Sequence, residues 1–294
     1  MLKKHIARIK SYIPGPVKEA ALAGRRLPRQ LTSRLRMLPG YILFGSMRSG
    51  TSSLYHNLSD HPNVLPALRK QVRYFDAHHA RGLDWYRAHF PTLRAARNAE
   101  RSHGRPVITG EASPEYIFHP LAPERIARAL PQVRLIALLR DPVDRAWSHY
   151  HHSVRNGLEP LSFEDALEAE SQRLGGEQQR AVAGGTPQCH ECHQHGYLTQ
   201  GAYADFLPRW FEHFAREQVL ILRSEDLFDD PAGSMGRVCD FLGLPDWGAP
   251  DWAALNAGSQ RPMEPALRER LLEHFRPHNE RLAELLGRGM GWDQ

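Results

Sequence analysis

A short apolar run followed by a glycine-bounded loop is the feature that most constrains the fold of this chain. Residues 41–44 have the composition of a buried strand, a loop extends from Gly45 to Gly50, and residues 51–59 are predicted to form a helix, with Ser49 or Thr51 near its cap. A strand, a tight loop and a helix in this order direct successive backbone N–H groups and the positive end of the helix dipole towards one point. The sequence therefore predicts a binding site for a phosphate or a similar anion.

The loop departs from the common ATP-binding pattern in one position. Gly45 and Gly50 have the spacing of G-x-x-x-x-G-K-[ST], and Ser52 occupies the final hydroxyl position. Thr51 stands where that pattern has Lys, and the loop carries a cation at Arg48 instead. These differences indicate a phosphate loop that does not carry out ordinary ATP chemistry.

The composition is that of a globular protein. The chain has 294 residues, of which 41% are hydrophobic and 24% charged, enough for one large α/β domain or two small ones. No apolar stretch approaches the length of a membrane span, and the basic segment 1–10 lacks the apolar core of a secretory signal. Three cysteines do not indicate a disulfide framework, so we expect a reducing, cytoplasmic location, with membrane association as an alternative.

The N-terminal segment 1–38 carries much of the net charge of +5, with ten basic residues against the single acid Glu19. Pro14, Pro16 and Pro28 interrupt it. We interpret it as a basic, solvated and partly helical extension to a domain that spans residues 39–294. Contact with an anionic membrane surface or a polyanionic substrate is the alternative, whereas nucleic acid is not predicted, because no recognition motif accompanies the charge.

Strand and helix patterns alternate along the rest of the chain. Strands are predicted at 41–44, 107–109, 133–139 and 218–223. Helices are predicted at 51–59, 83–90, 123–130, 142–155, 163–174, 203–214, 232–242 and 266–286. This alternation indicates an α/β fold with a P-loop-type central parallel sheet flanked by helices, in a single domain.

A second anion-binding element is predicted at the end of the strand 133–139. Arg140 follows this strand, at the edge where open α/β sheets bind ligands, and Ser148 lies one to two turns into the next helix. A guanidinium and a hydroxyl that converge there could hold a second phosphate. Taken alone, Arg140 could equally be an ion-pair partner and Ser148 an exposed helix residue.

Together the two segments resemble the nucleotide-dependent sulfotransferases. The first is similar to the family's loop for the 5′-phosphosulfate of 3′-phosphoadenosine 5′-phosphosulfate (PAPS), and the second to its 3′-phosphate motif, in which Arg-Asp-Pro ends a strand and Ser follows eight residues after Arg. Further matches at 201–203, 220–227 and 241–244 extend the resemblance over roughly residues 40–292. It is strongest to the carbohydrate branch related to the heparan sulfate sulfotransferases and to its bacterial relatives.

The resemblance implies PAPS as the donor, 3′-phosphoadenosine 5′-phosphate (PAP) as the product, and no metal requirement. Arg48 would contact the sulfonate and the bridging oxygen, where negative charge builds as the S–O bond breaks. The remaining donor contacts are expected from Ser49, Gly50, Thr51 and Ser52 at the 5′-phosphate and from Arg140 and Ser148 at the 3′-phosphate. Arg261, in the polar loop 256–262, is a further candidate for the 3′-phosphate or else a surface Arg.

The expected catalytic base is where this sequence departs from the family. The carbohydrate branch often has Lys-Glu-x-x-Phe-Phe, with Glu as the base, and Lys70 is kept here while Gln71 replaces that Glu. Lys70 can assist at the bridging oxygen, whereas Gln71 cannot usefully accept a proton. Glu111, expected just after the strand 107–109, is our candidate for the base. A structural or substrate-binding role for Glu111 is the alternative, and a histidine or an acceptor that needs less help also stays open.

The segment 189–195, Cys-His-Glu-Cys-His-Gln-His, has the residue types of a zinc site. No second, distant pair of ligands accompanies it, so we interpret it as a polar loop on the acceptor side. Zinc and a redox-active pair formed by Cys189 and Cys192 are the alternatives.

The sequence therefore predicts an enzyme that moves a sulfonate from PAPS to a hydroxyl, or less readily an amine. The acceptor is expected to be a carbohydrate, a glycolipid or a small metabolite. A P-loop kinase is disfavoured by Thr51 and by Arg140-Asp141-Pro142, which replaces an acidic, metal-binding strand end. A non-catalytic nucleotide-binding protein is the third hypothesis.

Overall fold

A four-stranded parallel sheet forms the centre of the computed structural model, which describes residues 15–175, 190–247, 252 and 262–292. The strands lie in the order β2-β1-β3-β4, and each neighbouring pair runs parallel. Their bounds are Tyr41–Gly45 for β1, Gly110–Ala112 for β2, Arg134–Leu139 for β3 and Val219–Arg223 for β4. The predicted α/β class and parallel sheet are confirmed.

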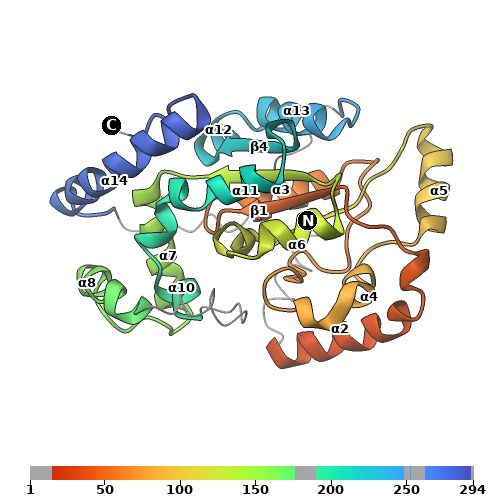
Figure 1. Ribbon diagram of the computed structural model, residues 1–294, viewed down its shortest axis with the longest axis horizontal. Coiled ribbons are helices and arrows are strands. Elements are labelled where there is room, and N and C mark those ends of the chain that lie inside the picture. Colours follow the sequence, from red (N-terminus) through yellow and green to blue (C-terminus); the bar gives the residue numbers. More distant parts are fainter. Residues whose placement is uncertain (1–14, 176–189, 248–251, 253–261, 293–294) are drawn as a thin grey trace.

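Helices cover both faces of this sheet (Figure 1). The described α-helices are α2 Gly15–Gln30, α3 Thr51–Ser59, α4 Gly82–Arg87, α5 Leu93–His103, α6 Ala122–Ala129, α7 Pro142–Arg155, α8 Phe163–Leu174, α10 His190–His195, α11 Leu207–His213, α12 Ser224–Asp229, α13 Pro231–Leu242 and α14 Pro265–Leu286. Helices α3, α7 and α8 have the predicted bounds. Helix α2 lies in the segment that was expected to be partly helical, whereas α5, α10 and α12 were not predicted. The helix expected at 203–214 is divided into the 3₁₀ turn η5, Tyr203–Asp205, and α11.

Alternate residues of β1 face opposite layers of the core. Ile42 and Phe44 are fully buried in a cluster shared with α6 and α11, whereas Tyr41 and Leu43 are fully buried in a second cluster shared with α3 and α13. Because successive side chains of a strand point to opposite faces, a strand covered on both sides must be apolar throughout. This explains why residues 41–44 appear in the sequence as a continuous apolar run.

The second strand begins three residues later than predicted. Ile108 forms only an isolated parallel bridge with Val64, and β2 begins at Gly110, which pairs with Tyr41. A Cβ atom at Gly110 would lie 2.4 Å from the Tyr41 ring, so the pairing needs glycine there. The expectation that Glu111 follows the strand is therefore wrong, because Glu111 lies within β2.

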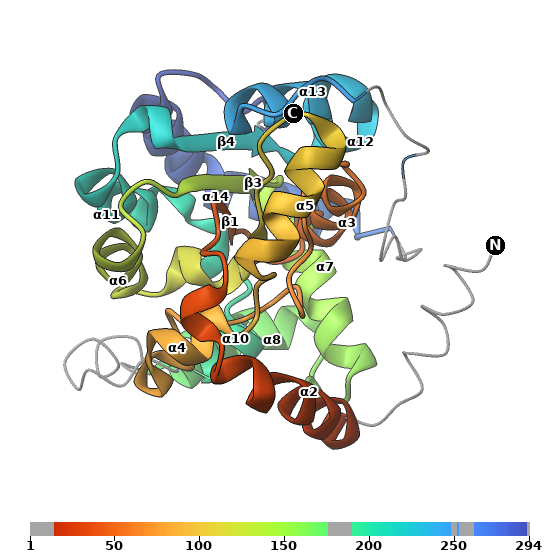
Figure 2. The ribbon, with the colours of Figure 1, turned by 90° about the vertical axis from the view of Figure 1, so that its right-hand side faces the viewer.

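The end of the N-terminal segment is attached to the domain. Helix α2 lies beside α4 (Figures 1 and 2), and the Arg29 side chain donates hydrogen bonds to the carbonyls of Ala88 at 2.7 Å and Phe90 at 2.8 Å. Arg36 donates to the same Phe90 carbonyl at 3.0 Å. Residues 1–14 lie outside the described part of the chain, and the domain boundary after residue 38 stays a prediction.

Replacing Gly110 by Ala should destabilise the fold by about 1–3 kcal/mol, because the added methyl would overlap the buried Tyr41 ring. Gly236→Ala in α13 is the matched control, since a Cβ there would meet nothing within 4 Å. It should change the free energy of unfolding by less than about 1 kcal/mol, in the stabilising direction. Chemical denaturation of both variants measures the difference, and equal effects would contradict the close packing of β2 on β1.

Candidate active site

The loop after β1 leaves the first turn of α3 open to an anion. Gly50 occupies the N-cap position with φ = 91°, and no side chain accepts a hydrogen bond from the first helical N–H groups. Gly50 rather than Ser49 or Thr51 is thus the cap residue, because its lack of Cβ permits the left-handed conformation. The uncapped N–H groups and the helix dipole favour a negatively charged ligand at this point.

The two predicted anion-binding motifs meet at the carboxyl edge of the sheet. Arg48 donates from Nε to the Ser148 hydroxyl at 3.1 Å, and Arg140 donates to the Arg48 carbonyl at 3.3 Å. Ser148 is only 2% exposed, so the interpretation as an exposed helix residue is wrong. Asp141 caps α7 by accepting hydrogen bonds from the N–H groups of Val143 and Asp144, which sets the direction of the helix that carries Ser148.

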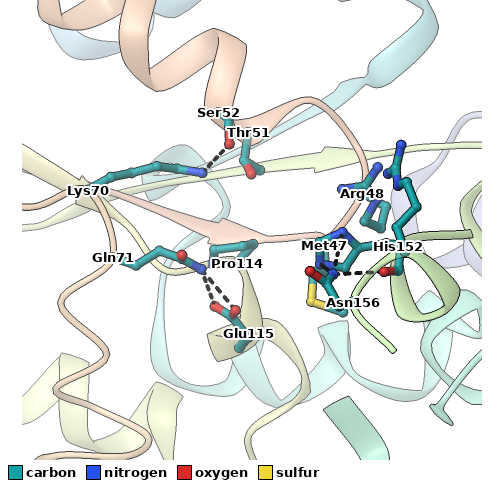
Figure 3. A pocket seen from close by; sticks show the side chains of 11 residues that line it. Met47, Arg48, Thr51, Ser52, Lys70, Gln71, Pro114, Glu115, His152 and Asn156 are labelled. Carbon is teal, nitrogen blue, oxygen red and sulfur yellow. Dashed lines mark hydrogen bonds between the residues drawn. The ribbon is translucent and has the colours of Figure 1, made fainter. Parts of the chain in front are cut away.

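A pocket of about 500 Å³ opens beside Arg48 (Figure 3). Four segments line it: the phosphate loop together with the start of α3, residues 70–71, the start of the 3₁₀ turn η3 (Pro114–Phe118), and the end of α7. Its lining residues are Met47, Arg48, Thr51, Ser52, Lys70, Gln71, Pro114, Glu115, His152, Arg155 and Asn156. The phosphate loop, Lys70 and Gln71 thus share one cavity, as the sequence predicted.

Partly buried cations dominate this pocket. Burial, together with repulsion from the nearby Arg155, Arg140 and Arg145, lowers the pKa of Arg48 to about 10. Burial also lowers the pKa of Lys70 to about 8, while the charge of Glu115 opposes that shift. Lys70 donates from Nζ to the Ser52 hydroxyl at 2.7 Å, which places its ammonium group on the phosphate loop. An anionic ligand would relieve the repulsion between Arg48 and the neighbouring arginines.

Glu115 lines the pocket, and sequence reasoning assigned it no role. Gln71 donates from Nε2 to both of its carboxylate oxygens, at 2.9 and 3.1 Å (Figure 3). The turn η3 packs closely on β1 because Gly45 has no side chain. A Cβ atom at Gly45 would lie 2.7 Å from the Ile117 side chain. Such a short 3₁₀ turn has no periodic sequence signal, which is why the position of Glu115 was missed.

His152 and Arg155 also line the pocket without having been predicted. Both follow Ser148 in α7, by four and seven residues, and residues at these spacings lie on the same side of a helix. This spacing is the signal by which the sequence could have indicated them.

Glu111 does not line the pocket. It is 0% exposed and accepts hydrogen bonds from the hydroxyls of Tyr86 at 2.8 Å, Tyr116 at 3.1 Å and Ser113 at 2.7 Å, and from the backbone N–H of Val72 at 3.1 Å. Burial raises its pKa to about 7, although all four hydrogen bonds act in the opposite direction. The buried carboxylate thus joins the segment after Gln71 to the segment before Glu115.

The Cys/His segment has protein partners where the structure describes it. Cys192 is disulfide-bonded, contrary to the expectation of free thiols, and Cys239 is free and buried. His193 contacts Arg73 at 3.1 Å, and His195 contacts Glu159 at 3.1 Å. Within the described ranges, no group of three or more His, Cys, Asp or Glu side chains is arranged to hold a metal ion. Cys189 and Arg261 lie outside these ranges.

The chain matches known proteins over most of its length. Residues 39–251 match the family model of the sulfotransferase domain. A membrane-associated sulfotransferase of Dictyostelium discoideum, kil1, is 27% identical over 88% of this chain and 67% of its own length. Human heparan sulfate glucosamine 3-O-sulfotransferase 3B1 is 29% identical over 88% of this chain and 66% of its own length. The chain therefore spans about two thirds of these curated relatives.

A solved structure shows the same fold. The crystal structure of a sulfotransferase from Alicyclobacillus acidocaldarius superposes with a TM-score of 0.67 at 30% sequence identity, covering 88% of this chain and 100% of that one. None of the helices in the described ranges combines the length and apolar character needed to cross a membrane.

Replacing Glu111 by Gln should change how stability depends on pH. The folded protein binds the Glu111 proton more tightly than the unfolded chain, with a pKa of about 7 against 4.5, so this carboxyl makes the parent protein less stable as pH rises through that window. Gln does not titrate. The free energy of unfolding of the variant should therefore rise by more than about 1 kcal/mol relative to that of the parent between pH 4.5 and 7. Urea denaturation across this range measures the difference, and parallel curves would contradict a raised pKa.

Proposed function

Because this chain belongs to the sulfotransferase family, we propose that it transfers a sulfonate from PAPS to a hydroxyl group of a carbohydrate or glycoconjugate. The observation that carries this proposal is the convergence of Arg48, Arg140 and Ser148 at one sheet edge, beside the open N-terminus of α3. Two groups of anion-binding residues fit a donor that has phosphates at both its 5′ and 3′ positions. The similarity to a heparan sulfate sulfotransferase supports a carbohydrate acceptor.

The donor site would use the residues expected from the sequence. The backbone N–H groups of residues 49–52 would hold the 5′-phosphate, and Arg140 and Ser148 the 3′-phosphate. The Ser148 hydroxyl, which accepts a hydrogen bond from Arg48, can donate its own proton to a phosphate oxygen. A contact from Arg261 and transfer without a metal stay predictions.

Arg48 and Lys70 would stabilise the leaving phosphate. Both cations are partly withdrawn from water, and Lys70 is held on the phosphate loop through Ser52. Positive charge placed beforehand where negative charge develops lowers the barrier, and it does so more strongly in a site with little water. Arg155, at the end of α7, lines the same pocket and would favour an acceptor that itself carries anionic groups.

Kinase chemistry is not favoured. The family match covers the phosphate loop, and Thr51 replaces the Lys that ATP-dependent P-loop enzymes use. A protein that binds the nucleotide without turnover would bind PAP but form no sulfated product.

The N-terminal segment supports a proposed peripheral contact with an anionic membrane. Leu27, Leu31 and Leu35 are 63%, 91% and 63% exposed. Leu27 lies in α2, Leu31 in the turn that follows it, and Leu35 in the 3₁₀ turn η1, Ser33–Leu35. Arg25 and Arg34, which are also exposed, lie close to these leucines in the sequence. Leucines flanked by arginines are typical of segments that lie at a lipid surface. A cytoplasmic location stays a prediction, and disulfides are uncommon in reducing compartments.

Leu31→Asp should weaken binding to vesicles that contain phosphatidylserine by at least about tenfold, because it removes apolar contact area and adds a negative charge. Leu158→Asp is the matched control, since Leu158 is also exposed, at 42%, but lies just after the end of α7, outside the basic segment 1–38. Sedimentation with vesicles measures both. Equal binding by the two variants, or no binding by the parent protein, would contradict the membrane contact.

Two arginine variants separate donor binding from catalysis. Arg140→Ala should weaken PAP binding about 10–100-fold in calorimetric titration, since charge-assisted hydrogen bonds contribute about 1.5–3 kcal/mol. Arg48→Ala should reduce turnover about 100–1,000-fold while PAP affinity falls less. Turnover is measured with labelled PAPS and a panel of desulfated heparan sulfate, neutral oligosaccharides and glycolipids. A preference for ATP with magnesium over PAP, or no labelled product with any acceptor, would overturn the proposed function.

A further inference from the structure

Among the described residues that line the pocket, one carries a carboxylate, and it is Glu115. The other charged groups around it are the cations Arg48, Lys70 and Arg155. Transfer to a hydroxyl needs a group that accepts the hydroxyl proton, and a carboxylate within the pocket can do so, whereas a guanidinium cannot. The His152 imidazole also lines the pocket, but the Asn156 amide contacts its two ring nitrogens, at 3.3 and 3.2 Å. A base must also lie where the acceptor lies, on the pocket side of the leaving phosphate. Glu115 meets this requirement, since it shares the pocket with Arg48 and Lys70.

Glu115 is held in one orientation by Gln71. The Gln71 amide donates to Oε1 at 2.9 Å and to Oε2 at 3.1 Å, so a single NH₂ group spans the carboxylate. Each carboxylate oxygen can accept a further hydrogen bond, and these two contacts leave that capacity free. Glu115 is 8% exposed, so it is largely withdrawn from bulk water, yet it borders the cavity. Figure 3 shows the Gln71 amide and the Glu115 carboxylate pointing towards each other.

Glu111 is unsuited to the same task. Its Oε1 accepts from two tyrosine hydroxyls, and its Oε2 accepts from Ser113 and from the Val72 backbone. Both oxygens are therefore occupied, and the residue is completely buried outside the pocket. Glu111 instead positions the segments that carry Gln71 and Glu115. Ser113 strengthens this connection by accepting a hydrogen bond from the Arg73 N–H at 3.1 Å.

We propose, on the basis of the sulfonate transfer proposed above, that Glu115 is the general base of this enzyme and that Gln71 orients it. Glu115 accepts the proton of the acceptor hydroxyl as that oxygen attacks sulfur. A new S–O bond forms to the acceptor, and the bond between sulfur and the bridging oxygen of PAPS breaks. The electron pair of the broken bond stays on the phosphate of PAP, beside Arg48 and Lys70. Glu115 then releases its proton to water.

Exchanging the two residues tests this assignment directly. Glu115→Gln should reduce kcat about 100–10,000-fold, the usual contribution of a general base, while the Kd for PAP changes less than about twofold. The double variant Gln71→Glu/Glu115→Gln returns a carboxylate to the same contact from the other side. The kcat of this double variant should be at least about tenfold higher than that of Glu115→Gln. Transfer is measured with labelled PAPS and whichever acceptor of the panel above gives the most product with the parent protein.

The pH profile distinguishes a base from a purely structural partner. In the parent protein, kcat/KM should fall at acid pH, because a general base acts only in its unprotonated form. This acid limb should vanish in Glu115→Gln and return in the exchanged variant. Glu111→Gln is the control and should keep the limb, because Glu111 positions the segments without taking the proton.

Each outcome bears on a different claim. If Glu115→Gln binds PAP and transfers sulfonate near the parent rate, or keeps the acid limb, Glu115 is not the base, although the sulfotransferase function stands. If the parent protein binds no PAP or forms no sulfated product with any acceptor, the proposed function falls, and the role of Glu115 falls with it. Should Glu115→Gln lose PAP binding through misfolding, Glu115→Asp replaces it. That variant should slow transfer while keeping the acid limb, and an unchanged rate would contradict the proposal.

Discussion

The parallel pairing of β1 with β3 is the constraint on which the active site depends. Leu43 pairs with Ile136 and Gly45 with Ala137, so both strands end at the same edge of the sheet. The loop after β1 and the start of α7 after β3 therefore face each other, and Arg48 reaches Ser148 across a sequence separation of 100 residues. Both strands are buried on two faces, so a shift in register would misplace apolar side chains in both core layers.

A second constraint is the buried carboxylate of Glu111. Burying a carboxylate is costly unless hydrogen bonds satisfy it. Glu111 accepts hydrogen bonds from the hydroxyls of Tyr86 and Tyr116. The Ser113 hydroxyl and the Val72 backbone N–H donate the other two. This network fixes the segment at 70–73 against the segment at 113–116. Stability and function are linked here, because the same network places Gln71 and Glu115 in contact at the pocket wall.

The electrostatics of the pocket follow from these two constraints. Burial in the pocket lowers the pKa of both Arg48 and Lys70, and the nearby Arg155, Arg140 and Arg145 add to the shift at Arg48. Such an arrangement disfavours the empty, fully charged site and favours arrival of an anionic donor. Glu115 places one negative charge opposite these cations. The pocket therefore separates a cationic side, suited to the leaving phosphate, from a carboxylate suited to the incoming hydroxyl.

The sequence by itself determined the central strands and helices α3, α7 and α8, and it singled out Arg48, Arg140 and Ser148, which the structure brings together. These features depend on local signals, namely continuous apolar runs, glycine spacing and a capping Asp, which act within a few residues. Only the tertiary structure decided where β2 begins, that Glu111 is buried, and that Glu115 meets Gln71. Each of these depends on contacts between segments about 40 to 70 residues apart. Local periodicity carries no information about such contacts, because they arise from packing and strand pairing.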